Sequence, residues 1–302
     1  MTDDSTGTTN ILLLGSKGFI GGSLVRCLST SGEFVVRGLD LPELDLTDER
    51  QVGSLLPGSV ENAVVVVAAA ITRDKDDSAA AMASNIKMAS NLAQVLKEHP
   101  ARQLIYLSTV DVYGRKNLKL PLSESSAVRP SNYYGISKLT CEHILRWVCD
   151  DTGIPLAVLR PPGVYGPHDS HNSPIRVFTT RALTGRTITL NGNGSELRDF
   201  LYIDDLCEVA RQVIVRSIHG TFNLVSGISH SIGDILRTIE DCCGYPIGVS
   251  FQGRQGDDDL VFERSAILTE IPTFTFTNIE EGLSQTVRCY QKELSEYCGT
   301  GV

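Results

Sequence analysis

Short, continuous apolar runs alternate with segments of helical spacing through the first half of the chain. Five such runs occupy residues 11–14, 34–36, 64–67, 104–107 and 156–159. Between them, apolar side chains recur at helical spacing over residues 19–28, 79–96 and 134–148. Runs without period-2 alternation are typical of strands that are buried on both faces of a parallel sheet. The alternation therefore predicts an α/β chain built on a doubly wound parallel sheet.

The second half of the chain is less regular. Proline and glycine pairs break it into short pieces, and helical patterns return over residues 203–215, 232–242 and 279–290. A length of 302 residues suits about two domains. We therefore expect a first domain over residues 1–165, with residues 199–227 returning to it. A smaller, partly interleaved α/β domain then occupies residues 166–198 and 228–302.

The charge balance excludes some classes of partner. Acidic residues number 36 against 27 basic ones, for a net charge of −9, and no run of Lys or Arg stands out. A nucleic-acid-binding protein needs a basic surface to neutralise phosphates, so we expect no nucleic-acid partner. No apolar stretch approaches the roughly 20 residues of a membrane span, and residues 1–10 lack a signal-peptide pattern. We expect a cytoplasmic protein without a membrane partner.

Eight cysteines are spread along the chain without a CxxC pair. Several of them fall in apolar runs, as Cys27 and Cys207 do. We interpret them as reduced, mostly buried thiols. On this reading the chain has neither a disulfide nor a metal site.

A glycine-rich turn follows the first apolar run. Residues 11–22 read ILLLGSKGFIGG, which places Gly15, Gly18 and Gly21 three residues apart where the strand gives way to a helix. Glycine permits a close approach of a pyrophosphate to backbone N–H groups, and a helix N-terminus favours negative charge. An ordinary tight turn is the alternative. We predict that the turn binds a dinucleotide through Gly15, Lys17, Gly18, Phe19, Ile20 and Gly21.

An acidic residue follows the second run, about 20 residues after the turn. Asp40 stands where a carboxylate can accept hydrogen bonds from the adenosine ribose. Its charge repels a 2′-phosphate, which favours NAD, whereas Lys17 and Arg37 keep NADP as the alternative. Asp45 and Leu46 are expected beside the adenine.

A tyrosine and a lysine lie four residues apart on the helix over residues 134–148. Tyr134 and Lys138 therefore share one helix face. The ammonium group favours the phenolate and lowers a phenol pKa that is otherwise about 10. Such a tyrosine can exchange a hydroxyl proton while a hydride moves to or from nicotinamide, and Thr109 can bind the same oxygen. The neighbouring Tyr133 lacks such a partner, because the residue four positions after it is Ser137, which carries no charge.

Seven ordered segments, including this glycine turn, resemble the extended short-chain dehydrogenase/reductases, the NAD-dependent nucleotide-sugar epimerase/dehydratase family. The resemblance covers nearly the whole chain. The other segments are residues 108–114 (STVDVYG), 134–138 (YGISK), 159–167 (LRPPGVYGP), 198–205 (RDFLYIDD), 222–227 (FNLVSG) and 254–257 (RQGD). The resemblance implies a Rossmann fold, bound NAD, and a homodimer formed through the helices over residues 79–96 and 134–148.

The same resemblance implies roles for further residues. Arg198 and Arg254 match arginines that hold the diphosphate of a nucleotide sugar, and Asp257 matches an acid that contacts its ribose. Asp111 stands where relatives place an additional base, so it joins Thr109, Tyr134 and Lys138 as a catalytic candidate. Additional cofactor contacts fall on Ala68, Ala69, Ala70, Asn85, Ser108 and Pro161, beside Tyr134 and Lys138.

The chain departs from the family pattern at three places, and these departures bear on the reaction. Gly163 replaces an Asn of many relatives, the short segment from Asp40 to Asp45 is similar to the reductase branch, and Val110 replaces the acid that dehydratases use. We expect a 4-epimerase that acts on a nucleoside-diphosphate hexose by transient oxidation. An NAD(P)H-dependent 4-keto-sugar reductase is the main alternative and a 4,6-dehydratase the third. A dinucleotide-sensing protein without catalysis is the non-enzyme alternative.

Overall fold

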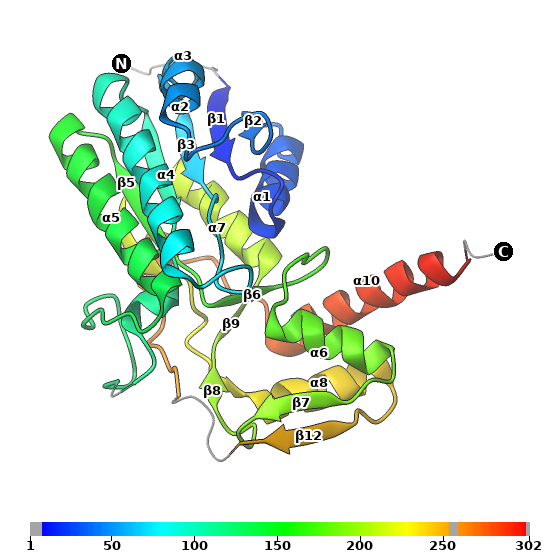
Figure 1. The fold of residues 1–302 in the computed structure, drawn as a ribbon. Coiled ribbons are helices and arrows are strands. Elements are labelled where there is room, and N and C mark those ends of the chain that lie inside the picture. The colour runs from blue at the N-terminus through cyan, green and yellow to red at the C-terminus, as the bar shows by residue number, and fades with distance from the viewer. Residues whose placement is uncertain (1–7, 117, 254–258, 300–302) are drawn as a thin grey trace. The chain divides into compact units, whose positions relative to one another are not determined.

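The computed structural model describes residues 8–116, 118–253 and 259–299, without the side chains of residues 297–299 (Figure 1). The chain divides into two compact units. The first comprises Met1–Thr109, Asn132–Arg160 and Cys207–Phe222. The second comprises Val110–Ser131, Pro161–Leu206 and Asn223–Val302.

The first unit contains a six-stranded sheet with the strand order β10-β5-β4-β3-β1-β2. Its strands are β1 (Thr9–Leu14), β2 (Phe34–Leu39), β3 (Val64–Val67), β4 (Gln103–Leu107), β5 (Leu156–Arg160) and β10 (Gly220–Asn223). Strands β1 to β5 pair in parallel. The order of the strands reverses between β1 and β3, and ligands of open α/β sheets bind at such a reversal. The doubly wound α/β fold is confirmed.

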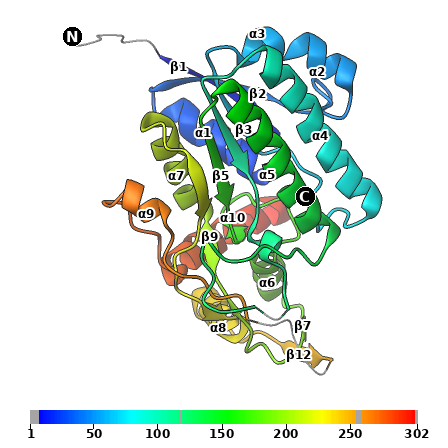
Figure 2. The same cartoon turned by 90° about the vertical axis from the view of Figure 1, so that its left-hand side faces the viewer.

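Helices cover both faces of this sheet. Helices α4 (Ala79–Glu98) and α5 (Tyr133–Thr152) lie on one face, and α1 (Phe19–Thr30) and α7 (Ile203–Val215) on the other (Figures 1 and 2). Two short helices, α2 (Glu49–Leu55) and α3 (Pro57–Val60), follow β2. Alternate strand residues such as Leu12, Leu14, Val65 and Val67 pack in one core cluster with α4 and α5. Since their neighbours along the strands are also buried, each of these strands reads as a continuous apolar run.

Strand β2 departs from the prediction of burial on both faces. It lies at the edge of the sheet, and the Val35 side chain is 56% exposed. An edge strand has one neighbour only, so its apolar residues receive less cover.

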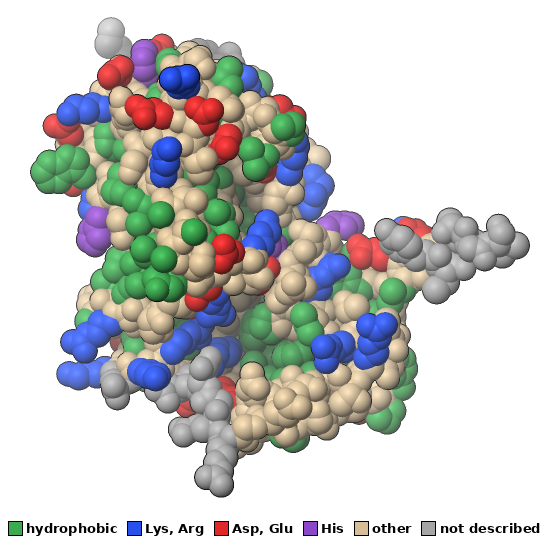
Figure 3. Space-filling model, in the orientation of Figure 1, with side chains coloured by type: hydrophobic (Ala, Val, Ile, Leu, Met, Phe, Trp, Pro, Cys, Tyr) green, Lys and Arg blue, Asp and Glu red, His purple; other side chains and the backbone are tan. Residues whose placement is uncertain are grey.

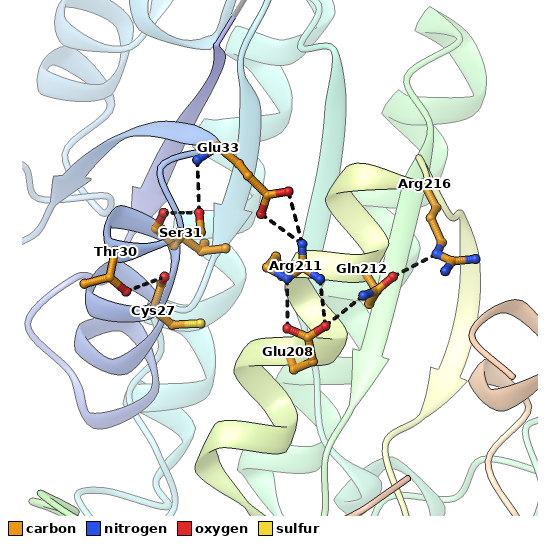
Figure 4. Close-up of polar contacts among 9 residues, drawn as sticks. Cys27, Thr30, Ser31, Glu33, Glu208, Arg211, Gln212 and Arg216 are labelled. Carbon is orange, nitrogen blue, oxygen red and sulfur yellow. Dashed lines mark hydrogen bonds and ion pairs between the residues drawn. The ribbon is translucent and has the colours of Figure 1, made fainter. Parts of the chain in front are cut away.

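A polar network attaches α7 to the connection between α1 and β2 (Figure 4). Arg211 donates two hydrogen bonds to the carboxylate of Glu208 and also pairs with Glu33 at 2.9 Å. Gln212 donates to Glu208 and accepts from Arg216. The network therefore joins segments that are far apart in the sequence within the first unit.

The second unit consists of short strands and three longer helices. Its strand pairs are β6 (Gly163–Tyr165) with β9 (Phe200–Tyr202), β7 (Ile188–Asn191) with β12 (Val249–Gln252), and β8 (Leu197–Arg198) with β11 (His230–Ser231). Helices α6 (Pro174–Leu183), α8 (Ile232–Cys243) and α10 (Ile279–Gly299) pack against one another. A 3-10 turn η1 (Val110–Tyr113) and the short α9 (Ile267–Glu270) complete the unit.

The bounds of the two units differ from those that the sequence suggested. Residues 110–131 and 161–165 belong to the second unit, and only residues 207–222 of the expected return belong to the first. Hydrogen bonds explain the first difference, because Leu122 N–H donates to the Val261 carbonyl and Tyr113 Oη donates to Asn223. The pairing of β6 with β9 explains the second.

The structure bears on the expectations about membrane spans and cysteines. Among the helices that the structure describes, none is long and apolar enough to cross a membrane. The seven cysteines whose side chains the structure describes are all free thiols. Three of the seven, Cys141, Cys149 and Cys207, are buried and the other four are partly exposed.

Candidate active site

The glycine turn lies where the strand order reverses. Gly15 directly follows β1 with φ of 89°, and a Cβ there would lie 2.5 Å from the backbone nitrogen of Ala69, just after β3. A Cβ at Gly21 would lie 1.9 Å from the Gly15 carbonyl oxygen. Both positions therefore need glycine for the turn itself.

Gly18 differs from these two glycines. It caps α1 in an extended conformation that any residue adopts, and its Cβ would meet no described atom closer than 3.6 Å. Packing within the protein does not require glycine here, whereas a phosphate that approaches the helix N-terminus would. These residues therefore fit a bound dinucleotide, as the sequence predicts.

Asp40 contacts the glycine turn directly. Its Oδ2 accepts a hydrogen bond of 2.8 Å from the Lys17 backbone N–H, and its Oδ1 accepts one from Leu41 N–H. The Lys17 ammonium group instead donates to Glu43 at 2.9 Å and to the Leu41 carbonyl at 2.7 Å. The hydrogen bond from the Lys17 ammonium group to Glu43 is the main cause of the lowered pKa of Glu43. Each carboxylate oxygen of Asp40 keeps acceptor capacity for a ribose hydroxyl.

The other basic residue near this edge, Arg37, donates to Ser59 Oγ at 2.8 Å. Both cations that the sequence offered for a 2′-phosphate therefore have partners within the protein. Asp45 also has partners, since its Oδ1 accepts from both the backbone and the hydroxyl of Thr47. This geometry stabilises the turn that precedes α2.

Tyr134 and Lys138 occupy successive turns of α5. Asn132 caps the helix by accepting from Gly135 N–H, and Asp77 accepts from Tyr134 N–H at 2.8 Å. The Lys138 side chain is buried, and its ammonium group lies 4.2 Å from the centre of the Tyr106 ring. Burial lowers the pKa of Lys138 from 10.5 to about 8, so the group stays mostly protonated at neutral pH.

One pocket of the first unit brings several predicted cofactor residues together. Leu46, Ala69, Ala70, Asn85 and Lys138 line it, beside the Tyr106 ring and Cys141. Asn85 also has a structural part, because its side chain bonds both the N–H and the carbonyl of Ile71 and donates to Ser137. The predicted residues from β3, α4 and α5 thus meet at the carboxyl edge of the sheet.

A buried ion pair next to Lys138 was not predicted from the sequence. Glu142 lies one turn after Lys138 on α5, and it forms two hydrogen bonds with Arg160 at the end of β5, of 2.9 and 2.6 Å. Ser108 Oγ, at the end of β4, also donates to Glu142. Residues 108, 142 and 160 therefore connect α5 to the strand ends next to Thr109. The spacing of Glu142 from Lys138 was the available signal.

Three predicted residues, Asp111, Pro161 and Arg198, belong to the second unit. Asp111 is buried and its Oδ1 accepts from Arg115 at 2.6 Å, and the Pro161 carbonyl accepts from Val110 N–H. Arg198 lies on β8, where it donates to the Leu197 carbonyl. Arg254 and Asp257 lie outside the described residues.

The residue after Arg198 is fixed in the protein interior. Asp199 accepts hydrogen bonds from Ser226, through both its backbone and its hydroxyl, and from Gly227 N–H. Burial raises the pKa of Asp199 to about 6. These bonds hold the segment that carries Arg198.

The sequence of the chain is similar to those of known proteins. A model of the NAD dependent epimerase/dehydratase family matches residues 11–224. The GDP-6-deoxy-D-talose 4-dehydrogenase of Aggregatibacter actinomycetemcomitans is 30% identical over 234 residues, which is 76% of this chain and 78% of that protein. An uncharacterized UDP-glucose epimerase of Bacillus subtilis is 29% identical over 174 residues, which is 57% of this chain and 54% of that protein.

A solved structure has the same fold. The UDP-glucose 4-epimerase of Thermotoga maritima, determined with UDP-glucose, gives a TM-score of 0.84 at 24% identity. The match covers 95% of this chain and 100% of that chain. At this identity the likeness shows the fold.

Proposed function

The chain belongs to the NAD-dependent epimerase/dehydratase family, and we propose that it is a 4-epimerase of a nucleoside-diphosphate hexose. The observation that carries the proposal is the placement of Tyr134 one turn before a buried, mostly protonated Lys138 on α5, at the edge of the sheet where the glycine turn lies. This arrangement suits proton exchange at a sugar hydroxyl.

The chemistry divides between the cofactor and the protein. NAD, which the glycine turn and Asp40 would hold, would supply the acceptor for a hydride from the sugar carbon and the source of the same hydride on its return. Tyr134 Oη takes the proton of the sugar hydroxyl and later gives it back, while Thr109 holds the same oxygen in position. The Lys138 ammonium group favours the phenolate form of Tyr134. Inversion requires that the ketone presents its opposite face before the hydride returns.

NAD is the proposed cofactor because Asp40 lies at the turn and Lys17 is paired with Glu43. We expect Asp40→Ala to weaken NAD binding and to reduce the discrimination against NADP, since a ribose acceptor and a repelling charge are lost together. Calorimetric dissociation constants for both cofactors test this expectation. Glu98→Gln is the control, since it removes an exposed carboxylate at the C-terminal end of α4 and should keep the preference for NAD. If the wild-type protein prefers NADP, the residue that selects the cofactor is Lys17 and not Asp40.

Arg198 is proposed to bind the diphosphate of the substrate, together with Arg254, and Asp257 to contact its ribose. A charge-assisted bond to phosphate is worth roughly 1.5–3 kcal/mol, so Arg198→Ala should weaken nucleoside-diphosphate binding about tenfold or more. Calorimetry with UDP, dTDP, CDP and GDP measures the loss. Binding of NAD should stay at the wild-type level, because the glycine turn holds it. Unchanged binding of every diphosphate would remove Arg198 from the substrate site.

A 4-keto-sugar reductase is the second candidate. The relative with 30% identity is a 4-dehydrogenase of a GDP-sugar, and the connection between Asp40 and Asp45 is short. The state of the purified protein separates the two functions. An epimerase retains NAD through the cycle, whereas a reductase exchanges NAD(P)H with solution at each turnover.

Two other expectations belong to the same proposal. Helix α5 exposes Tyr133, Ile136 and Trp147, the last at 80%, and hydrophobic side chains gather on the side where α4 and α5 lie (Figure 3). We propose this surface as the interface of a homodimer, which sedimentation analysis would test. A cytoplasmic location stays a prediction.

A further inference from the structure

Three different metal-binding side chains converge in the second unit, among residues that the proposed reaction does not use. His168 lies in the loop between β6 and α6, and Cys289 and Glu293 lie one turn apart on α10. Their potential ligand atoms are all within 4.8 Å of one another. His168 and Cys289 are more than a hundred residues apart in the sequence, which is why spacing gave no metal signal.

The distances fit a tetrahedral ion. His168 Nδ1 lies 3.3 Å from Glu293 Oε1, and Cys289 Sγ lies 3.6 Å from the same oxygen. Around a tetrahedral zinc ion with ordinary bond lengths, a nitrogen and an oxygen ligand lie about 3.4 Å apart, and a sulfur and an oxygen about 3.6 Å apart. Two of the three pairs of ligand atoms therefore already stand at the separations that zinc requires, and the third pair lies within 4.8 Å.

The loop that carries His168 is held in place by neighbouring contacts. Tyr290, next to Cys289 on α10, donates through its hydroxyl to the Gly166 carbonyl at 3.2 Å. Asp169 is buried and accepts from His171 N–H and Ser173 Oγ. The backbone N–H of His168 also donates to the Cys289 sulfur. The loop and α10 are thus positioned before any ion binds, which lowers the entropic cost of binding.

We propose that His168, Cys289 and Glu293 bind a zinc ion. A thiolate with an imidazole and a carboxylate suits zinc, whereas calcium and magnesium prefer oxygen ligands throughout. The His168 and Glu293 side chains are 62% and 40% exposed, so water is available as the fourth ligand. The bound ion ties the loop between β6 and α6 to α10. This proposal does not depend on the proposed epimerase activity.

Cobalt(II) is the probe, because it replaces zinc and reports on sulfur coordination by a charge-transfer absorption band. Reduced protein that has been freed of metal by a chelator is titrated with Co²⁺ and then with Zn²⁺. We expect a thiolate-to-cobalt band that saturates at one equivalent and disappears when zinc displaces cobalt. Zinc should also raise the Tm of the protein, since it binds the folded state.

Variants assign the ligands. Cys289→Ser should abolish the charge-transfer band, and His168→Ala should weaken metal binding at least about tenfold. Because the His168 side chain is exposed, its variant keeps the proposal testable if Cys289→Ser fails to fold. Cys242→Ser and His219→Ala change a thiol and an imidazole elsewhere and should bind cobalt as the wild type does. A wild type without the band, or a band unchanged in folded Cys289→Ser, would overturn the proposal, as would unchanged affinity in His168→Ala.

Discussion

Turnover of the Tyr134→Phe variant is expected to fall at least about 10²-fold, because the variant lacks the hydroxyl that exchanges the sugar proton. The fold should persist, since the phenylalanine ring keeps the shape of the side chain and the cap of α5 uses the backbone of Tyr134 and the side chain of Asn132. Turnover on a panel of nucleoside-diphosphate hexoses, with NAD present, measures the loss. The Tm of the variant reports on the fold separately.

Tyr133 provides a matched control on the same helix. Its side chain is 44% exposed, and Ser137 stands at the spacing where Tyr134 has Lys138. Tyr133→Phe should therefore keep turnover within a few-fold of the wild type. Lys138→Met should lower turnover in the same way as Tyr134→Phe, because the phenolate loses its cation. Tyr134→Phe turnover close to that of the wild type would remove Tyr134 from the chemistry.

Arg160→Met is expected to lower the free energy of unfolding by about 3–5 kcal/mol, because it leaves the buried Glu142 carboxylate without its cation. Glu142 then keeps a hydrogen bond from Ser108 and the charge of the nearby Lys138, neither of which replaces the two hydrogen bonds from Arg160. Denaturant unfolding of the two proteins measures the difference. Since Glu142 lies one turn from Lys138, turnover should fall as well.

Two controls separate an uncompensated charge from general damage. The double variant Glu142→Leu with Arg160→Met removes both charges and should recover much of the stability that Arg160→Met loses. The surface pair of Arg237 and Asp234 is exposed, and Arg237→Met should leave the free energy of unfolding almost unchanged. A double variant as unstable as the single one would contradict the electrostatic explanation.

The strands at the centre of the sheet could be predicted because burial on both faces leaves an unbroken apolar run. Residues 64–67 are four valines, and all of β3 is buried. The same criterion wrongly predicted burial on both faces for the edge strand β2, since an apolar run does not reveal how many neighbouring strands a strand has. Helix α6 was missed because Arg176, Thr179 and Thr180 interrupt its apolar pattern.

In the candidate site too, some residues could be predicted from the sequence and others could not. The glycine turn, Asp40, Tyr134 and Lys138 could be found because each depends on local spacing. The pairing of Lys17 with Glu43, and of Glu142 with Arg160, depends on how separate elements pack, and the sequence alone did not contain it. Gly18 needed both the sequence and the structure. The sequence motif contains this glycine, and the structure shows that packing within the protein does not require it.

We propose that the protein inverts C4 of a nucleoside-diphosphate hexose by removing and returning the same hydride. Substrates that carry deuterium at C4, with UDP, dTDP, GDP or CDP as the nucleotide, test it directly by nuclear magnetic resonance. We expect at least one of these sugars to be converted to its C4 epimer, with deuterium retained at C4 and no net formation of reduced cofactor. If none of these sugars is inverted and the protein consumes NAD(P)H stoichiometrically on a 4-keto sugar, the protein is a reductase and not a 4-epimerase.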